Sequence, residues 1–486
     1  MINVLLWLPL AAGLLCFVLP RRTVRAVPIL GALAALALAT VLVFDFEPGA
    51  AGLQHAVDER WIPDLGVRYE LGVDGISVFL VLLTTVLWAA ATLYSAFSPP
   101  ERPRTYFFML GVAETGALGA FLAQDLLLFV LFFDLMLVPF YFLIGAWGGE
   151  DRIRATMKMM VYTLVGSLLM LVGAIATAVI AADGGELSFS LADLRANVLG
   201  EGSQDWIFWF FAAAFLVKMP AFLVHGWMPD AYRAAPIAVV AVLSGVLSKV
   251  GAYGFLRVGL PLYPDAAVKF QEVLLVIAVA GIVYGGAMAF TQTNVRLVAG
   301  FSSLAQLGFI TLGIFSLRPD GADGAVLQMV NHGLVVAPTF FIIGVLAARA
   351  GTEDLREMGG LAFRAPILAA LFLIVTLATL AMPGSANFVG EFYILIGAFQ
   401  AKVVYAIVAT IGIAFAAFYA IRLYQRTMHN RLPDGVTSRE ITWREGLVIA
   451  PLVACIVALA LYPGLILERG EASVEQAVHP ERLVAQ

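Results

Sequence analysis

The sequence alternates long apolar runs with short stretches that are rich in charged residues, proline and glycine. Many runs reach about 20 residues, the length that an α-helix needs to cross a hydrocarbon layer about 30 Å thick. Each of fourteen such runs predicts a transmembrane helix. The runs are 2–20, 26–44, 73–95, 106–122, 124–146, 157–181, 206–229, 234–257, 273–291, 296–316, 324–348, 366–396, 401–424 and 445–463.

Composition agrees with this pattern, because 61% of the 486 residues are hydrophobic and only 13% are charged. So little polar surface cannot cover a soluble globule of this size. The first run has no basic residues before it and Arg21, Arg22 and Arg25 after it, so we interpret it as a retained helix rather than a cleaved signal peptide. The sequence therefore predicts an all-α, multi-pass membrane protein.

The distribution of Lys and Arg predicts how the chain is oriented. Loops after odd-numbered helices hold most basic residues, as in Arg152, Arg154 and Lys158, whereas loops 45–70 and 183–205 are partly acidic. Short cytoplasmic loops hold an excess of Lys and Arg. We therefore expect a protein of the cell inner (plasma) membrane with both termini on the non-cytoplasmic side.

Cysteine usage argues against a bound metal or redox centre in this chain. Cys16 and Cys455 lie in apolar runs at opposite ends of the sequence, so no Cys-x-x-Cys pair or iron–sulfur spacing occurs. We expect no cofactor and no metal in this chain, and no nucleic acid among its partners.

Ionisable residues within the apolar runs are the candidate functional groups, because a charge at membrane depth costs about 2.5 kcal/mol or more. Acidic and basic groups alternate over several helices, which is the arrangement that a proton relay needs. A carboxylate near a buried lysine stabilises its charged form, so moving one partner changes the protonation of the other. The residues are Glu114, Asp134, Lys218, Lys249, His332 and Glu391.

Each candidate also has a structural interpretation. Asp134 can form a structural ion pair with a lysine, and His332 can satisfy a neighbouring backbone or hydroxyl group. Glu114 has no obvious partner in the sequence. His225 lies near Trp227, where an interfacial or loop contact explains it as well as proton transfer does. Lys218 and Lys249 are too far from the helix ends to extend to the membrane surface.

Two predicted helices are interrupted by proline and glycine close to an ionisable residue, in segments 218–230 and 382–391. Proline removes a backbone donor, which is tolerated at membrane depth only where protein or water fills the gap. Paired broken helices are typical of inverted repeats with an ion path between them. We predict N-terminal helices 1–3 over 1–105, two inverted five-helix repeats over 106–260 and 261–430, and helix 14 with a tail over 431–486.

Several motifs resemble the antiporter-like membrane chains of respiratory complex I, most closely chain M of bacterial NADH-quinone oxidoreductase (chain 4 of the mitochondrial enzyme). The resemblance covers nearly the whole chain. It implies a fourteen-helix, proton-translocating subunit whose partners include two paralogous chains, with NADH, FMN, iron–sulfur clusters and quinone bound by other subunits. The motifs are FFDLMLVPFYFLIGAWGG (132–149), KMPAFLVHGWMPDA (218–231), GVLSKVGAYGFLR (245–257), MVNHGLV (329–335) and MPGSANFVGEFYILIGAFQ (382–400).

The resemblance also implies roles for individual residues. Asp134 matches the helix-5 carboxylate that pairs with the helix-7 lysine, here Lys218. Lys249 matches the central lysine of helix 8, His332 the histidine of helix 11, and Glu391 the residue of helix 12 at the exit of the proton path.

The chain departs from the family pattern at four positions. Asp134 stands where the family usually has Glu, so its carboxylate is one methylene further from the lysine. Gln306 replaces a titratable histidine and cannot take up a proton at neutral pH. Arg233 replaces a histidine and Asn294 an acidic residue. The last two changes affect the predicted entry side of the proton path.

Other classes of protein remain open at this stage. A subunit of a multisubunit Na⁺/H⁺ antiporter, or of a related membrane-bound hydrogenase or dehydrogenase, would share the relay and the fold. A free-standing transporter would need a solute pocket, and no polar cluster beyond the relay predicts one. A purely structural scaffold would not be expected to keep buried lysines.

Overall fold

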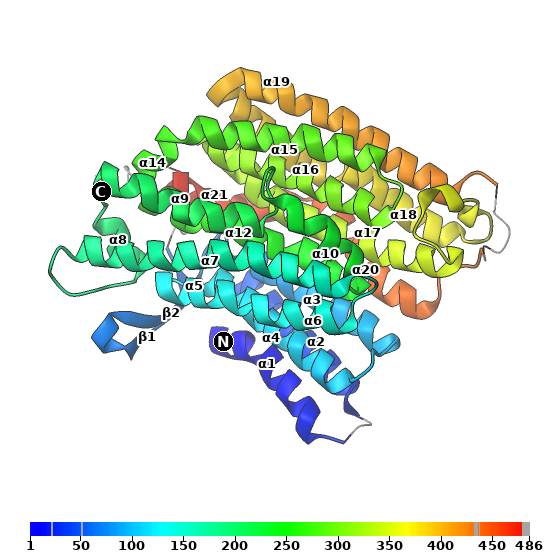
Figure 1. The fold of residues 1–486 in the computed structure, drawn as a ribbon, viewed down its shortest axis with the longest axis horizontal. Helices are drawn as coiled ribbons and strands as arrows, with labels where there is room; N and C mark the ends of the chain where they lie inside the picture. Colours follow the sequence, from blue (N-terminus) through cyan, green and yellow to red (C-terminus); the bar gives the residue numbers. More distant parts are fainter. Residues whose placement is uncertain (21–22, 50–51, 432–435, 437, 479–486) are drawn as a thin grey trace.

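The computed structural model describes residues 1–20, 23–49, 52–431, 436 and 438–478. Most helices lie side by side along the long axis of the molecule, with a β-hairpin at one end (Figure 1). We call this the hairpin end, and we call the opposite end, where α18 and α20 begin, the basic end. The hairpin pairs β1 (Gln54–Ile62) with β2 (Val67–Val73) in antiparallel fashion.

The helices of the bundle are α1 (Ile2–Val18), α2 (Ala26–Asp45), α3 (Val78–Phe97), α4 (Pro103–Leu122), α5 (Leu126–Leu135), α6 (Leu137–Trp147), α7 (Arg152–Ala182), α9 (Glu201–Lys218), α10 (Met228–Ala234), α11 (Ile237–Val242), α12 (Ser248–Gly254), α13 (Leu260–Leu262), α15 (Gln271–Thr291), α16 (Val295–Phe315), α17 (Pro319–Ala350), α18 (Pro366–Thr379), α19 (Ala386–Met428) and α20 (Trp443–Leu461). The remaining α-helices are α8 (Leu191–Ala196), α14 (Pro264–Lys269) and α21 (Gly464–Val478), all at the hairpin end (Figure 1).

Helix forms within every one of the fourteen predicted runs. In the described part of the chain, eleven helices or nearly continuous helical segments are long and apolar enough to cross a membrane. Two further apolar helices, α1 and α18, are shorter. The prediction of a mainly helical, multi-pass membrane protein is therefore confirmed, while the count of fourteen crossings stays a prediction. The sequence did not predict the β-hairpin or the helices α8, α14 and α21.

Both predicted interruptions are present. Residues 219–227 separate α9 from α10 and include a 3₁₀ turn over His225–Trp227, and residues 380–385 separate α18 from α19. Each interruption contains a residue with a left-handed backbone, Leu223 with φ 79° and Ala381 with φ 52°. Proline near each of them cannot donate the next helical hydrogen bond.

Two further irregularities were not predicted. The fifth run divides at Met136, between α5 and α6. Pro139 lies four residues after Leu135 and cannot donate to its carbonyl, which accounts for the break. The eighth run contains two π-helical turns, η4 (Leu243–Leu247) and η5 (Phe255–Gly259), on either side of α12. Such turns are rare and occur frequently at functional sites.

Small residues let α12 and its π-helical neighbours pack very closely against other helices. A Cβ added to Gly333 of α17 would lie 2.7 Å from the carbonyl oxygen of Gly245 in η4. A Cβ added to Gly251 of α12 would lie 2.5 Å from the carbonyl oxygen of Phe215 in α9. Close backbone approach at small residues is typical of helix packing in membranes. The centre of the bundle is therefore dense.

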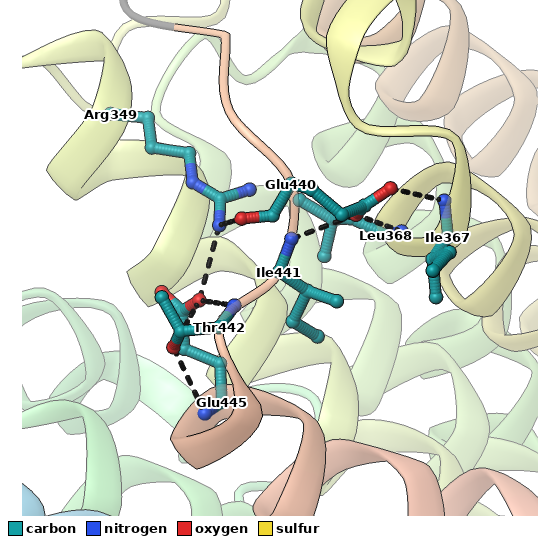
Figure 2. A network of polar contacts seen from close by, with 7 residues as sticks. All are labelled: Arg349, Ile367, Leu368, Glu440, Ile441, Thr442 and Glu445. Carbon is teal, nitrogen blue, oxygen red and sulfur yellow. Dashed lines mark hydrogen bonds and ion pairs between the residues drawn. The ribbon is translucent and has the colours of Figure 1, made fainter.

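A polar network at the basic end ties three helices together (Figure 2). Arg349 of α17 contacts the Glu445 carboxylate and the Glu440 carbonyl, each at 3.1 Å. The Glu440 carboxylate accepts hydrogen bonds from the first backbone N–H groups of α18, those of Ile367 and Leu368, at 2.9 and 3.1 Å. Glu440 thereby caps the N-terminus of a helix that supplies half of an interrupted run.

Candidate functional site: a buried polar axis

The first group of buried charges lies where α5, α7 and α9 meet. Lys218, the last residue of α9, is 3% exposed and donates to the Phe133 carbonyl at 2.9 Å. Its ammonium also lies 4.3 Å from the centre of the Phe133 ring. Asp134 follows on α5, beside the break at Met136, and one of its carboxylate oxygens is buried without a hydrogen-bond partner.

Asp134 and Lys218 influence one another electrostatically but are not in contact. The charge of each side chain acts electrostatically on the other. Among the described residues, however, no ion pair joins Asp134 and Lys218. Lys218 instead binds the carbonyl one residue before Asp134.

The second group centres on Lys249 of α12, which is fully buried. Its ammonium donates to the Ser244 carbonyl at 2.6 Å, and the Ser248 hydroxyl donates to the same oxygen at 2.8 Å. Ser244 belongs to η4, so the π-helical turn supplies this acceptor. The Ser244 hydroxyl lies 3.1 Å from that of Ser303 on α16, which extends the polar group to a further helix. Lys249 has no carboxylate in ion-pair contact in the described structure.

His332 of α17 is brought next to this group by the close approach of Gly333 and Gly245. It is 3% exposed, and its Nδ1 atom has no hydrogen-bond partner. The charge of Lys249 acts electrostatically on the His332 ring. Because Nδ1 has no hydrogen-bond partner, the interpretation that His332 simply satisfies a neighbouring group does not hold for this ring nitrogen.

The third group is a chain of side-chain hydrogen bonds across α17, α16 and α19. Gln328 Nε2 donates to Gln306 Oε1 at 2.7 Å, and Gln306 Nε2 donates to Glu391 Oε1, also at 2.7 Å. Glu391 is 3% exposed. Gln306 thus contacts the carboxylate directly, although an amide cannot carry a proton by titration.

A small cavity of about 30 Å³ lies between His332 and Gln306, which both line it. This volume has room for a water molecule or two. Asn387, at the start of α19, and Tyr419 also line it, and both polar side-chain atoms of Asn387 lack partners. The polar side chains of His332, Gln306 and Asn387 in its wall provide hydrogen-bond partners for water between the second and third groups.

Two of the sequence candidates lie apart from this axis. Glu114 of α4 is buried, with one oxygen unpartnered, and lines a cavity of about 10 Å³ formed mainly with residues of α1 and α2. His225 lies in the α9–α10 break, with its ring 5.1 Å from that of Tyr284. In α10, which follows this break, Asp230 pairs with Lys158 of α7 at 2.8 Å.

At the basic end a depression of about 930 Å³ opens over the ends of α6, α10 and α16. Arg233 and Asn294, two of the departures from the family pattern, both line it. Asn294 accepts from the backbone N–H of Arg296 at 3.0 Å and caps α16, which is a structural use of an amide at this position. Arg296 pairs with Glu353 at 2.7 Å.

Sequence reasoning missed Gln328, Ser244 and Ser303. Gln328 precedes His332 by four residues and so shares its helix face, and an amide in an apolar helix is a signal that could have been used. The two serines gave no such signal, because serine is common in membrane helices. Within the described residues, no group of three or more His, Cys, Asp or Glu side chains is arranged to hold a metal ion.

Interrupted apolar helices around buried lysines and carboxylates define a class of multi-pass helical membrane proteins with a polar axis through the bundle. Residues 123–416 match the family model described as NADH:quinone oxidoreductase/Mrp antiporter, TM. The chain belongs to this family, and within it to the subunit M group of NADH-quinone oxidoreductase.

Individual relatives agree along nearly the whole length. NADH-quinone oxidoreductase subunit M of Rhodobacter capsulatus is 37% identical, with 98% of this chain and 96% of the relative covered. The subunit M of Escherichia coli is 36% identical over 97% of this chain and 96% of its own.

A chain in the structure of respiratory complex I from Thermus thermophilus with bound NADH matches with TM-score 0.89 and 31% identity, covering 98% of this chain and 99% of that one. A chain of the Mrp complex from Dietzia sp. matches with TM-score 0.84 at 21% identity, covering 100% of this chain and 99% of that one, which shows likeness of fold alone.

Proposed function

We propose that this chain is a proton-translocating subunit in the membrane arm of NADH-quinone oxidoreductase, which couples electron transfer in other subunits to H⁺ movement through its own buried axis. The observation that carries the proposal is the run of polar groups from the half-buried Asp134 through the buried side chains of Lys218, Lys249 and His332 to Glu391. Membership of the subunit M group supports the role of the parent complex.

The proposed topology has fourteen crossings, with both termini on the non-cytoplasmic side of the plasma membrane. α19 supports this count, because 43 residues of helix would extend about 65 Å, roughly twice the hydrocarbon thickness. Lys402 interrupts it with a non-helical φ of −152°. Lys402 pairs with Glu272 at 3.5 Å, at the start of α15 near the hairpin end. Residues 386–401 would then complete crossing 12, and 403–428 would form crossing 13.

The proposed repeats are 106–260 and 261–430, flanked by helices 1–3 over 1–105 and by helix 14 and a tail over 431–486. Each repeat contains one interrupted run, α9 with α10 in the first and α18 with α19 in the second. Lys218 and Glu391 lie within a few residues of these two interruptions. This correspondence supports an inverted pair with the ion path between the halves.

The proposed mechanism begins when a change in a neighbouring subunit alters the separation of Asp134 and Lys218. The Lys218 bond to the Phe133 carbonyl, in place of the Asp134 carboxylate, supports a separated arrangement of this pair as one state of the cycle. An uncompensated charge on Lys218 acts on Lys249 through the packed α9–α12 contact and favours release of its proton. The proton then moves past His332, through water in the 30 Å³ cavity, to Glu391.

The partners follow from the parent complex. We propose that the chain contacts other membrane-arm subunits, including two paralogous antiporter-like chains, as well as lipid. The NADH, FMN, iron–sulfur and quinone sites belong in this proposal to other subunits. The depression at the basic end, lined by Asp230 and Arg233, is the proposed cytoplasmic entrance for protons.

The test is NADH-driven proton pumping in membrane vesicles whose complex carries Lys218→Ala. Pumping and quinone-linked turnover are expected to fall, while NADH oxidation by an artificial acceptor continues, because that reaction bypasses the membrane arm. Lys269→Ala is the matched control, since Lys269 is exposed and pairs with Asp205 outside the axis. Full coupled pumping by assembled Lys218→Ala would contradict the relay.

Purification separates the proposed parent complex from the alternatives. The chain should be recovered together with flavin and iron–sulfur absorbance from its partners, along with NADH oxidation. Recovery in a complex without these absorbances, and with Na⁺/H⁺ exchange, would favour a multisubunit antiporter. Hydrogenase or another dehydrogenase activity in the recovered complex would point to that related class instead.

A further inference from the structure

A second large cavity lies at the hairpin end, away from the groups described above. It has a volume of about 570 Å³ and lies between α8, η5, α14 and α21. It reaches the surface at Val198, which is 48% exposed, and it extends inward to Asp74 and Arg257. Water can fill a space of this size and polarity.

The inner wall of this cavity is a buried ion pair. Arg257 Nη2 lies 2.5 Å from Asp74 Oδ2, and both side chains are nearly inaccessible. Asp74 also accepts a hydrogen bond from the Ser77 backbone N–H at 3.0 Å. The guanidinium and the Ser77 N–H both interact favourably with a carboxylate, so the contacts of Asp74 favour its ionised form.

Further from the cavity than the ion pair, the helical segment formed by α12 and η5 carries Tyr253 and Lys249. Arg257 Nε donates to the Tyr253 hydroxyl at 2.9 Å, and Tyr253 donates to the Phe121 carbonyl at 3.0 Å. Lys249, Tyr253 and Arg257 are spaced four residues apart, and such residues share a face of a helix. Tyr253 is fully buried and does not line the cavity. Arg257 thus separates the cavity from the Tyr253–Lys249 face.

We propose that this cavity is an aqueous vestibule with a second route to Lys249, and that the Asp74–Arg257 pair is the barrier that closes this route to protons. The inference rests on the proposed function. A guanidinium stays protonated in proteins, so it cannot release a proton to the next group. In addition, a fixed cation beside a water-filled passage repels protons. The Tyr253 hydroxyl accepts from Arg257 and donates its only proton to the Phe121 carbonyl, so it has no proton free to donate to water while the pair is closed.

The expected strength of the barrier follows from its position. Four residues of helix correspond to about 6 Å, and a cation at that distance in surroundings of effective dielectric near 20 disfavours a proton roughly a hundredfold. Asp74 offsets part of this effect. Removing the charge of Arg257 is therefore expected to raise passive proton flow about tenfold.

The experiment measures passive proton flow, without NADH, into liposomes that contain the whole complex under an imposed membrane potential. The complex with Arg257→Gln is expected to leak about tenfold faster than the unaltered complex. Gln476→Ala is the matched control, because Gln476 lines the same cavity but carries no charge. A leak that is unchanged by Arg257→Gln, or raised equally by Gln476→Ala, overturns the barrier.

The double variant Arg257→Gln with Lys249→Ala tests the route. The extra leak should disappear, and a leak that persists shows a path that avoids Lys249 and overturns the proposal. If Arg257→Gln does not assemble, Ala477→Cys, at a buried position that lines the cavity, is labelled in the otherwise unaltered complex with a membrane-impermeant maleimide from the hairpin side. Absence of labelling beyond that of the parent chain means that the cavity is not aqueous, which also overturns the proposal.

These outcomes are distinct from those of the proposed function. Failure of the relay is seen as unchanged NADH-driven pumping in Lys218→Ala or Lys249→Ala, each with the barrier intact. Failure of the barrier is seen in passive flow alone. The relay can therefore stand while the vestibule is refuted.

Discussion

Gly333→Ala is predicted to disturb the centre of the polar axis without removing any polar group. The added Cβ would lie 2.7 Å from the Gly245 carbonyl oxygen and 2.7 Å from Leu83 Cδ2. The Leu83 side chain can rotate away, but the carbonyl belongs to the backbone of η4. α17 and η4 must therefore separate by several tenths of an ångström, and overpacking of this kind costs about 1–3 kcal/mol.

The separation also affects function, because His332 precedes Gly333 and the acceptor of Lys249, Ser244, precedes Gly245. We expect a shorter half-life of quinone reductase activity on heating and reduced proton pumping per NADH. Oxidation of NADH by an artificial acceptor should be unaffected.

Gly446→Ala is the matched control, since no atom lies within 4 Å of its added Cβ. Alanine in a helix is favoured over glycine by about 0.5–1 kcal/mol, so this variant should be as stable as the parent or slightly more so. The packing argument is refuted if Gly333→Ala matches Gly446→Ala in both heat stability and pumping.

Two further predictions concern polar contacts. Glu440→Gln should cost about 1–2 kcal/mol, seen as faster thermal inactivation, because a charged cap of α18 is lost. Burial opposes ionisation of Glu440, but backbone N–H groups and Arg349 lower its pKa below the usual 4.5. Its contribution to stability should therefore be present above pH 4.5 and decline as pH falls through the lowered pKa; equal pH dependence in parent and variant would contradict this. Gln306→Leu should reduce pumping about tenfold or more, because Glu391 loses a charge-assisted hydrogen bond of roughly 1.5–3 kcal/mol, and unchanged pumping would remove Gln306 from the axis.

The positions of the helices could be predicted because the bilayer sets the length of an apolar run, and no tertiary information is needed for that. Buried lysines and carboxylates could be identified for a similar reason, since their cost at membrane depth is independent of the details of packing. The interruptions near Pro220 and Pro383 had a second signal in their glycines and ionisable neighbours.

Other breaks could not be predicted from proline alone. Pro139 divides α5 from α6, whereas Pro338 stays inside α17 and Pro451 inside α20. Neighbouring helices decide whether the released carbonyl is satisfied in place. The π-helical turns around Lys249 likewise depend on packing against α9 and α17.

Contacts between side chains of distant helices were also beyond the sequence. Gln306 carried only the information that a histidine was absent, and its bonds to Gln328 and Glu391 require the register of three helices. The acceptor of Lys218 was expected to be a carboxylate and is a backbone carbonyl in this structure. A backbone carbonyl that accepts a hydrogen bond at a helix break cannot be recognised from the side chains in the sequence.

The central claim is that protons pass through the axis at Lys249, and the most direct measurement is the number of protons pumped per NADH by vesicles carrying Lys249→Ala. NADH oxidation by an artificial acceptor, followed in parallel, reports assembly of the complex. The account predicts that pumping and quinone-linked turnover fall while the artificial-acceptor rate holds. An assembled complex that pumps normally without Lys249 would contradict the account.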